Sequence, residues 1–421
     1  MTAAVPRVLL LVDGPPVAEN AGEVFLRSLF LHYPEGHACR LALVRSASAS
    51  PQDNWIGFPL AAEKRVWERR LTRFGRLPSR VASTALSSYS RNIRTAKVVD
   101  HGTAFGRRHG VDRVFAVLNS PAVIYSASRM ASALRIPLST LVWDPPERLA
   151  ADLLMDRYST ARLLGDFARA LRGSSAVAVA SEGMKRAYAA QYGVRAEVMI
   201  QGIPAHWLSG RSARSYAQDS FIIGFAGSAY ASAEFSALVG ALSAARWEIA
   251  GRKVVLRVLG RGTGFDFRSA VNIEFLGWRG PADTVEQLRA TDACYVPYWL
   301  DHDHAQTVEL CFPNKISSYL AAGKPLFVHG PEKSSPARFV NRYGLGVVCS
   351  SLNHEVILED LGRLLLEPDG VSSVAEGSRR AIDDELSMNV FLDRFARLVG
   401  VDRRELRTLV PEAFDDMMCD A

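Results

Sequence analysis

The sequence contains few cysteines, and their spacing matches neither a disulfide framework nor a zinc site. Five cysteines are scattered over 421 residues, and no two of them stand in a C-x-x-C arrangement. Disulfide scaffolds and structural zinc sites require paired or regularly spaced cysteines. The pattern therefore argues against both, and it favours a protein of the reducing cytoplasm.

Long apolar runs are also missing. No stretch approaches the roughly 20 apolar residues that a membrane-spanning helix needs. The apolar run VLLLV near the start ends at once in Asp13-Gly14-Pro15-Pro16, which is not the composition of a signal peptide. We interpret this run as a buried strand that enters a loop, and we expect neither a signal peptide nor a membrane span.

Several catalytic signatures are absent as well. There is no G-x-G-x-x-G after the first apolar run, no P-loop, no G-x-S-x-G and no H-E-x-x-H. The run DHDH (301–304) places two histidines two residues apart, but the sequence indicates no third ligand, so we expect no metal site. This run is either a loop near a bound ligand or a plain exposed loop.

The residues that are present suffice for two domains. The length exceeds the usual size of one domain, and 48% of the residues are hydrophobic. Short apolar runs alternate with helical patterns along most of the chain, which predicts parallel, doubly wound α/β sheets. The strand-like runs are 8–12, 39–44, 114–118, 138–143, 176–180, 198–200, 221–227, 254–260, 273–277, 293–298, 326–330 and 346–350.

A polar segment divides these runs into two series. We expect an N-terminal domain over 1–204, a linker over 205–220, a C-terminal domain over 221–386 and terminal helices over 387–421 that pack back on the first domain. Two such sheets in succession imply a cleft between the domains. Open sheets of this kind bind ligands beyond the carboxyl ends of their strands.

The formal charge of +6 is unevenly distributed. The basic segment 63–108 contains twelve Lys or Arg against three Asp or Glu. Apolar residues stand among its arginines, namely Val66, Trp67, Leu71, Phe74 and Leu77. Either the segment lies on an anionic membrane surface, or it is a solvated helix face whose apolar residues join the core. No nucleic-acid-binding module accompanies the charge, so we expect no nucleic-acid partner.

The segment ELCFPNKISSYLAAGKPLFVHG (309–330) carries the strongest chemical signal. Pro313 suits the first turn of a helix, which would end at Gly323. The N–H groups near the helix start would be free, and Lys315 would add a full positive charge there. The pattern predicts a phosphate site, although a helix start with a purely structural role would look the same. The predicted site comprises Pro313, Asn314, Lys315, Ile316, Ser317 and Ser318.

The run F-P-x-K-x-x-x-Y-L-A-A-G-K-P within this segment resembles the nucleotide-diphosphate segment of GT-B glycosyltransferases, chiefly family-4-like bacterial polysaccharide and glycoconjugate enzymes. FIIGFAGS (221–228) and VVLRVLGRG (254–262) are similar to the first two strands of their donor domain. NIEFLGWRG (272–280) resembles the segment that flanks the nucleobase, and LRATDACYVPY (288–298) the elements before the diphosphate segment. The order and spacing hold over roughly residues 220–350, whereas the first half is similar only loosely. The resemblance implies two Rossmann-like domains that face a cleft.

The resemblance also assigns residues to a donor site. Lys315 would bind the donor diphosphate, and Gly227, Ser228, Gly277 and Arg279 would lie around it. The family's Arg and Lys after the first glycine of the donor domain have no counterpart in GSAYASAEF (227–235). Lys315 would therefore carry the charge stabilisation, helped by the backbone of Gly227 and Ser228. Arg261 and Arg279 are either further helpers or exposed surface residues.

Two further positions depart from the family pattern. Ser318 stands where many relatives have a Glu that holds the ribose, so ribose recognition would be weaker or shifted. Glu309 is one residue out of register with the first Glu of the family motif. It either faces the donor sugar or is a solvated loop carboxylate.

The activity implied is glycosyl transfer from a nucleotide-diphosphate sugar to a glycan, lipid-linked or other hydroxyl acceptor. It would be hexosyltransferase-like, without a metal or cofactor, in the cytoplasm or on the inner face of the membrane. An inverting reaction needs a general base, for which we select Asp144 in WDPPE; its other interpretation is a turn-forming residue before two prolines. Asp13, Asn20 and Gly22 are acceptor-side candidates. The alternatives are a non-catalytic nucleotide-sugar-binding or scaffolding relative and a sugar-nucleotide epimerase.

Overall fold

The computed structural model describes residues 5–14, 21–44, 58–65, 68, 76–209, 220–260, 272–366 and 368–419. Its contacts divide the chain into two compact units. Unit 1 comprises Met1–Met199 and Leu392–Ala421, and unit 2 comprises Ile200–Phe391. The first division thus falls just before the expected linker, and the second lies within helix α15 (Met388–Val399).

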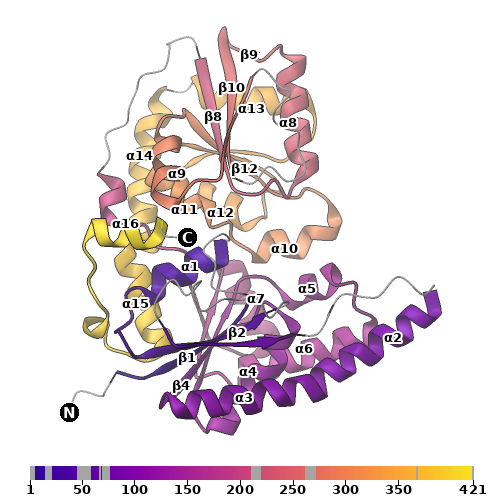
Figure 1. Ribbon diagram of the computed structural model, residues 1–421. Coiled ribbons are helices and arrows are strands. Elements are labelled where there is room, and N and C mark those ends of the chain that lie inside the picture. Colours follow the sequence, from indigo (N-terminus) through magenta and orange to yellow (C-terminus); the bar gives the residue numbers. More distant parts are fainter. Residues whose placement is uncertain are drawn as a thin grey trace. The chain divides into compact units, whose positions relative to one another are not determined.

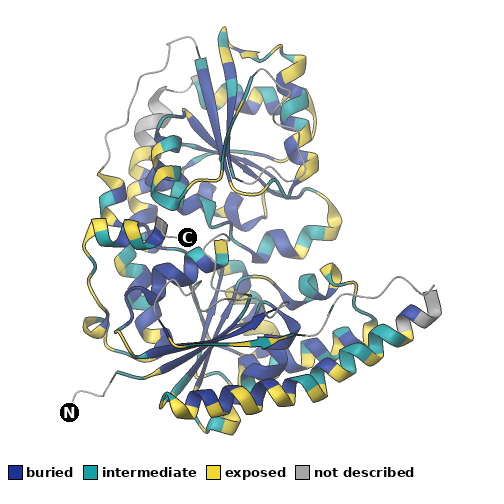
Figure 2. Cartoon of the chain, viewed as in Figure 1, coloured by how far each residue is buried: buried dark blue, intermediate teal, exposed yellow. Residues whose placement is uncertain are grey.

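Unit 1 is built on a seven-stranded sheet in the order β3-β2-β1-β4-β5-β6-β7, in which every neighbouring pair is parallel. Its central strands are buried throughout, as expected where helices cover both faces (Figure 2). The strands are β1 (Val8–Asp13), β2 (Ala38–Val44), β3 (Leu60–Lys64), β4 (Arg113–Val117), β5 (Leu138–Val142), β6 (Ala176–Val179) and β7 (Ala196–Val198).

The helices of unit 1 include one long rod, in which α2 and α3 are joined by the π-helical turn η2 (Ser90–Arg94) (Figure 1). The end of the chain completes this unit, because Phe395 of α15 packs against the rings of Phe30, Tyr33 and Phe115. Besides α15, the helices are α1 (Ala21–Phe30), α2 (Arg76–Tyr89), α3 (Thr95–Arg108), α4 (Pro121–Leu134), α5 (Pro146–Asp152), α6 (Arg157–Arg172), α7 (Glu182–Tyr192) and α16 (Pro411–Cys419).

Unit 2 repeats the architecture with the sheet order β11-β10-β8-β12-β13-β14, again parallel. A short strand, β9, pairs antiparallel with β10 at the side. The strands are β8 (Ser220–Ala226), β9 (Glu248–Ile249), β10 (Arg252–Leu259), β11 (Ile273–Gly277), β12 (Ala293–Pro297), β13 (Leu326–His329) and β14 (Gly346–Cys349).

The helices of unit 2 connect these strands, and the π-helical turn η5 (Ile382–Leu386) leads into α15. Residues of β8, β10, β12 and α8 form its main apolar core. The helices are α8 (Ser232–Ala244), α9 (Pro281–Arg289), α10 (Ala305–Leu310), α11 (Lys315–Ala321), α12 (Ser335–Tyr343), α13 (His354–Leu366) and α14 (Pro368–Ala381).

The predicted fold class of two doubly wound, Rossmann-like domains is confirmed. Each strand-like run of the sequence overlaps a strand, although the run 198–200 shares only Val198 with β7, and β3 and β9 were not predicted. In each sheet the strand order reverses once, between β1 and β4 in unit 1 and between β8 and β12 in unit 2. Ligands of such sheets bind beyond the carboxyl ends of the strands at this reversal. Among the described helices, none has the length and hydropathy to cross a bilayer.

Candidate functional site

Three glycines with positive φ end neighbouring strands of unit 2. Gly227 (φ 107°) follows β8, Gly260 (φ 136°) follows β10, and Gly277 (φ 72°) ends β11. The Gly227 N–H donates to the Leu259 carbonyl at 2.8 Å, and the Gly260 N–H donates to the Gly277 carbonyl at 2.8 Å. The strands therefore end in a tight backbone surface that needs glycine. The Gly227 N–H is therefore already hydrogen-bonded and cannot donate to an anion. The expectation that the backbone of Gly227 helps to bind the donor phosphates is wrong.

The most constrained of these positions is Gly260. A Cβ atom there would lie 2.5 Å from the Gly227 carbonyl oxygen. We therefore expect Gly260→Ala to lower the free energy of unfolding by about 3 kcal/mol, measured by urea denaturation. Gly251→Ala is the matched control, because Gly251 also has a positive φ (76°) but has open space around it, and we expect a loss of about 1 kcal/mol. Equal losses in the two variants would contradict the close approach at Gly260.

Lys315 begins helix α11 and directs its ammonium group to the reversal point beside Gly227. The Nζ atom is buried and has no hydrogen-bond partner among the described residues. It lies 4.2 Å from the ring centroid of Phe225 and 5.0 Å from that of Tyr230. The aromatic faces attract the cation weakly, but they do not replace the water or the counter-ion that a buried ammonium requires. The arrangement is suited to an anion that approaches Gly227.

The charge of Lys315 depends on its surroundings. Burial lowers the pKa of Lys315 from its usual value near 10.5 to about 7, because desolvation disfavours the charged form. A neighbouring anion acts in the opposite direction and raises the pKa of an ammonium group. The side chain can therefore change protonation state when an anion arrives.

The start of α11 differs from the prediction. The helix begins at Lys315 rather than at Pro313, and it has seven residues. The Ile316 N–H donates to the Pro313 carbonyl and the Ser317 N–H to the Asn314 carbonyl, each at 3.1 Å. The expectation of a free N–H at Ile316 is therefore wrong. Because so short a helix has a small dipole, the ammonium group dominates the electrostatics here.

The two serines of the first turn have different surroundings. The Ser317 hydroxyl is buried and donates to the Gln201 carbonyl at 2.8 Å, so it anchors α11 to the start of unit 2 and is not available to a ribose or a phosphate. Ser318 is half-buried in the same turn as Lys315. A ligand contact by Ser318 stays a prediction, whereas the hydroxyl of Ser317 is already used.

Two other predicted donor residues have surface partners. Glu309 lies in α10 rather than in a loop, with Oε1 3.3 Å from the Lys333 ammonium. Arg279 lies just before α9, with Nε 3.2 Å from the Asp283 carboxylate. Ser228 is exposed after Gly227, and Arg261 and Asn20 lie outside the described residues.

The DHDH run forms a cap and an aromatic stack. The Asp301 carboxylate accepts the His304 N–H at 3.0 Å, and the His304 ring stacks on Trp299 with centroids 4.4 Å apart. Trp299 packs in turn on Tyr230, which reaches Lys315. No group of three or more His, Cys, Asp or Glu in the described part of the chain could hold a metal ion. The sequence analysis missed Tyr230 and Phe225, although both flank the glycine at the end of an apolar run.

Of the acceptor-side candidates of unit 1, Asp13 and Gly22 are described, and Asp13 lies at the reversal between β1 and β4. Asp13 ends β1, and its Oδ1 atom lies 2.6 Å from Nη1 of Arg65, which also contacts Glu68 at 3.4 Å. The Glu68 carboxylate accepts the Ala122 N–H at 3.0 Å, in the first turn of α4. Sequence reasoning missed Arg65 and Glu68, which look like ordinary members of a charged run. Gly22 lies in the first turn of α1.

Asp144 follows β5 at the carboxyl edge of the same sheet. Its carboxylate is exposed and lies 3.6 Å from the Arg148 guanidinium, which is also 3.6 Å from Asp152. The position is therefore at the expected edge and open to solvent.

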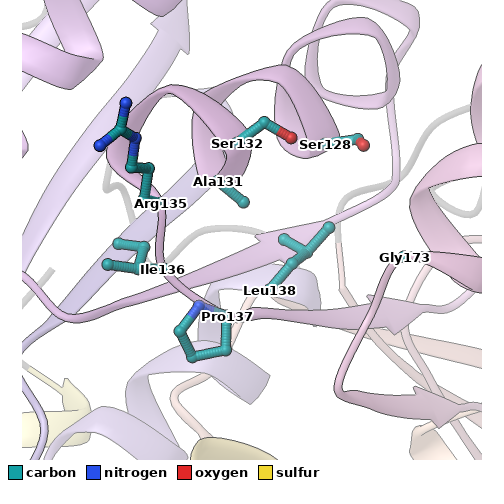
Figure 3. A pocket seen from close by; sticks show the side chains of 8 residues that line it. All are labelled: Ser128, Ala131, Ser132, Arg135, Ile136, Pro137, Leu138 and Gly173. Atoms are coloured by element: carbon teal, nitrogen blue, oxygen red, sulfur yellow. The ribbon is translucent and has the colours of Figure 1, made fainter.

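A hollow of about 280 Å³ lies elsewhere in unit 1 (Figure 3). Ser128 of α4, Arg135 just after α4, Leu138 at the start of β5 and Gly173 after α6 are among the residues that line it. This is the amino edge of the sheet, opposite to the edge where such folds bind ligands. The hollow therefore has no place in the candidate site.

No protein-family model and no curated protein matches the chain. Solved structures do match over nearly the whole length. HepE from Anabaena in complex with UDP matches with a TM-score of 0.63 and 15% identity, over 93% of this chain and 99% of that chain. Sucrose-phosphate synthase from Thermosynechococcus elongatus matches with a TM-score of 0.65 and 12% identity, over 94% and 98%.

The N-terminal domain of Candida albicans trehalose-6-phosphate phosphatase also matches, with a TM-score of 0.63 and 9% identity, over 95% of this chain and 98% of that chain. At such low identities the likeness shows the fold alone. The fold is GT-B, as the sequence resemblance implied.

Proposed function

We propose that this chain is a glycosyltransferase that takes a sugar from a nucleotide-diphosphate donor bound by unit 2. The observation that carries the proposal is the Lys315 ammonium, which is buried, lacks a hydrogen-bond partner among the described residues and lies beside Gly227 at the reversal of the sheet. A diphosphate supplies the missing counter-ion. Ser228 and Ser318 line the same edge and can contact the donor.

The chemistry of transfer fits a single cation. The bond between the anomeric carbon and a phosphate oxygen breaks, and the bond electrons remain on the departing nucleoside diphosphate. A bond between the acceptor oxygen and the anomeric carbon forms, and the acceptor hydroxyl loses its proton. A fixed ammonium group in a poorly solvated site stabilises the charge that develops on the leaving diphosphate. This arrangement requires no metal ion, and we propose that the enzyme uses none and has no cofactor.

Asp144 is proposed as the general base that accepts the acceptor proton if the reaction inverts configuration. Asp144→Asn should then lower turnover about 10²- to 10⁴-fold while leaving donor affinity unchanged. Asp152→Asn is the control, since Asp152 is exposed and contacts the same Arg148 guanidinium. Steady-state kinetics with saturating donor would measure both variants. Equal activity of the two variants would leave Asp144 with a turn-forming role only.

The acceptor is proposed to be a glycan or a lipid-linked hydroxyl in polysaccharide or glycoconjugate synthesis. The transferred sugar is proposed to be a hexose. The positive charge of the basic segment 63–108 supports a peripheral position on the cytoplasmic face of a membrane. HepE is known in complex with UDP and with UDP-glucose, so uridine donors are the first to test.

Two alternatives remain distinct in their predictions. A non-catalytic nucleotide-sugar-binding relative would bind the donor but release no nucleoside diphosphate when an acceptor is added. A sugar-nucleotide epimerase would convert the donor sugar without any acceptor. Two features support the first of these: residues 227–235 lack the family's phosphate-binding Arg and Lys, and the Glu positions are altered at Glu309 and Ser318.

The test is a calorimetric and thermal-shift screen of the purified protein with UDP, GDP, ADP and TDP, each with and without EDTA. Binding of one nucleotide that persists in EDTA supports a metal-independent donor site and identifies the base. The corresponding sugar nucleotides are then assayed for acceptor-dependent release of the nucleoside diphosphate. Failure of all four nucleotides to bind would refute the proposal.

A further inference from the structure

The outward side of the α2–η2 rod is apolar. Val81 is 65% exposed, Tyr89 is 41% exposed and Ile93 is 52% exposed. Exposed Ala85 stands between them, and spacings of four residues place such side chains on one side of a helix. A helix face turned to water is ordinarily polar, so this row is unusual. The apolar residues that the sequence analysis singled out (Val66, Trp67, Leu71 and Phe74) lie outside the described residues, and the side chain of Leu77 is not described.

The fold does not require this row. The rod is attached to unit 1 through other positions, because Ser79, Ser90, Thr95 and Val98 are buried. The hydroxyl of Thr84 and the guanidinium of Arg91 bond to carboxylates of residues at or in α6. The exposed row thus stands apart from the contacts that hold the rod in place.

The helices around the row are strongly basic. Residues 76–108 contain seven Lys or Arg and one Asp, and residues 157–172 of α6 contain four Arg and one Asp. Together these two stretches have a larger positive charge than the net +6 of the entire chain. The partner of this surface is therefore expected to be anionic.

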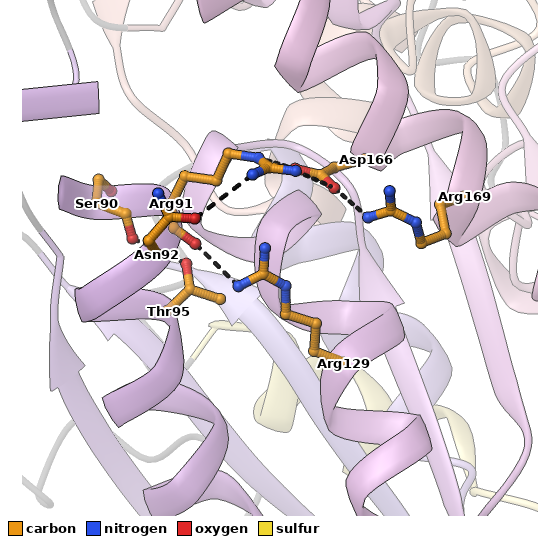
Figure 4. Close-up of polar contacts among 7 residues, drawn as sticks. All are labelled: Ser90, Arg91, Asn92, Thr95, Arg129, Asp166 and Arg169. Carbon is orange, nitrogen blue, oxygen red and sulfur yellow. Dashed lines mark hydrogen bonds and ion pairs between the residues drawn. The ribbon is translucent and has the colours of Figure 1, made fainter. Parts of the chain in front are cut away.

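A cluster of guanidinium groups lies where the rod meets α6 (Figure 4). The buried Asp166 carboxylate accepts hydrogen bonds from Arg91, with Nε at 2.5 Å, and from Arg169. Arg129 of α4 donates to the Arg91 carbonyl at 3.0 Å. One carboxylate therefore pairs with two guanidinium groups, Arg129 bonds to a backbone carbonyl instead, and the Arg169 side chain is exposed. The cluster therefore carries an excess of positive charge where the rod meets α6.

We infer that the outer face of α2 and η2, formed by Val81, Ala85, Tyr89 and Ile93, docks on an anionic phospholipid surface. The apolar row enters the boundary between headgroups and acyl chains, and the surrounding arginines contact lipid phosphates. Exposed aliphatic side chains favour lipid over nucleic acid, and a face with excess positive charge repels a second copy of itself. This inference identifies the surface that would contact the membrane. It rests on the proposed function only for the peripheral membrane position proposed there.

The experiment compares vesicle binding of the full chain and of the variant Val81→Ser/Tyr89→Ser/Ile93→Ser. Vesicles of phosphatidylcholine alone and of phosphatidylcholine with phosphatidylglycerol are sedimented with each protein. We expect the unaltered chain to bind only the anionic vesicles, less at higher salt, and the variant to lose about tenfold or more in partitioning. The control is Val410→Ser/Leu352→Ser, which removes exposed apolar side chains elsewhere and should bind as the unaltered chain does.

Several outcomes would overturn the inference. The inference fails if the unaltered chain does not bind anionic vesicles, or if the triple variant partitions onto them as well as the unaltered chain. It also fails if the control variant loses as much vesicle binding as the triple variant. A changed oligomeric state of the triple variant with unchanged vesicle binding would assign the face to a second copy instead. Nucleotide calorimetry on the triple variant separates the two proposals, because donor binding should stay unchanged. If neither the unaltered chain nor the triple variant binds nucleotide, while vesicle binding still depends on this face, only the proposal of a donor site fails.

Discussion

Lys315→Met should reduce the affinity for nucleoside diphosphates about 100-fold and lower turnover about 10²- to 10³-fold. Methionine keeps the length of the aliphatic stem against Phe225 and Tyr230 but removes the ammonium group. The Nζ atom of Lys315 lies beside Gly227, is buried and has no hydrogen-bond partner among the described residues. Its loss therefore removes the main electrostatic attraction for the donor diphosphate.

The same substitution should not destabilise the protein. A lone buried charge is unfavourable in the ligand-free state, so replacing it with an apolar side chain should leave the thermal unfolding temperature unchanged or raise it. Isothermal calorimetry and thermal unfolding, each with and without nucleotide, separate the effect on binding from the effect on folding. Lys333→Met is the control, because Lys333 is an exposed lysine paired with Glu309. If Lys315→Met binds nucleotide as tightly as this control, the phosphate assignment is incorrect.

Donor affinity should fall about tenfold between pH 6 and pH 8. Burial lowers the pKa of Lys315 to about 7 in the free protein, and a bound diphosphate raises this pKa. Donor binding therefore takes up a proton above pH 7. Affinity is highest below this pH and decreases as the pH rises from 7 toward the pKa of the bound state. A sugar nucleotide is the appropriate ligand, since each of its two phosphates has one ester bond, one shared anhydride bond and a single strongly acidic hydroxyl that does not titrate in this range.

Calorimetry at pH 7.5 in two buffers with different ionisation enthalpies measures the proton uptake directly. Lys315→Arg is the matched control, because a guanidinium group stays charged throughout this range and should flatten the pH profile. A profile of the unaltered protein that is as flat as that of the arginine variant would show that Lys315 is charged before the donor binds. The ligand-free protein supplies an independent check. Its unfolded chain binds the extra proton between about pH 7 and 10.5, so this group makes stability rise with pH there.

Much of the architecture was predictable because strand signals are local. A buried parallel strand reads as a short apolar run whatever surrounds it, and such runs predicted both sheets. Strand β3, LAAEK, has no such run, since it lies at the edge of the sheet and is largely half-buried or exposed. The two-residue strand β9 is too short for any periodic signal. These strands form because a neighbouring strand offers its edge.

The candidate site also has one part that was predictable from the sequence and one part that was not. Lys315 at the start of a helix and Gly323 at its end belong to one continuous segment, so the sequence alone was enough to predict this helix. The sequence overestimated the helix itself, because the early turn bonds of Ile316 and Ser317 and the contact of Ser317 with Gln201 depend on how that turn packs. The aromatic rings that surround the ammonium group, Phe225 and Tyr230, come from another segment, at and just after the end of β8.

The sequence by itself therefore determined the two-sheet α/β fold and the segment that carries Lys315. These features follow from periodicity and from turn residues a few positions apart. Only the tertiary structure decided that the Lys315 ammonium is buried without a counter-ion, that Gly260 must lack a side chain, and that the α2 row faces outward. Burial, close backbone approach and pairing depend on residues brought together from distant parts of the chain, and no local pattern encodes them.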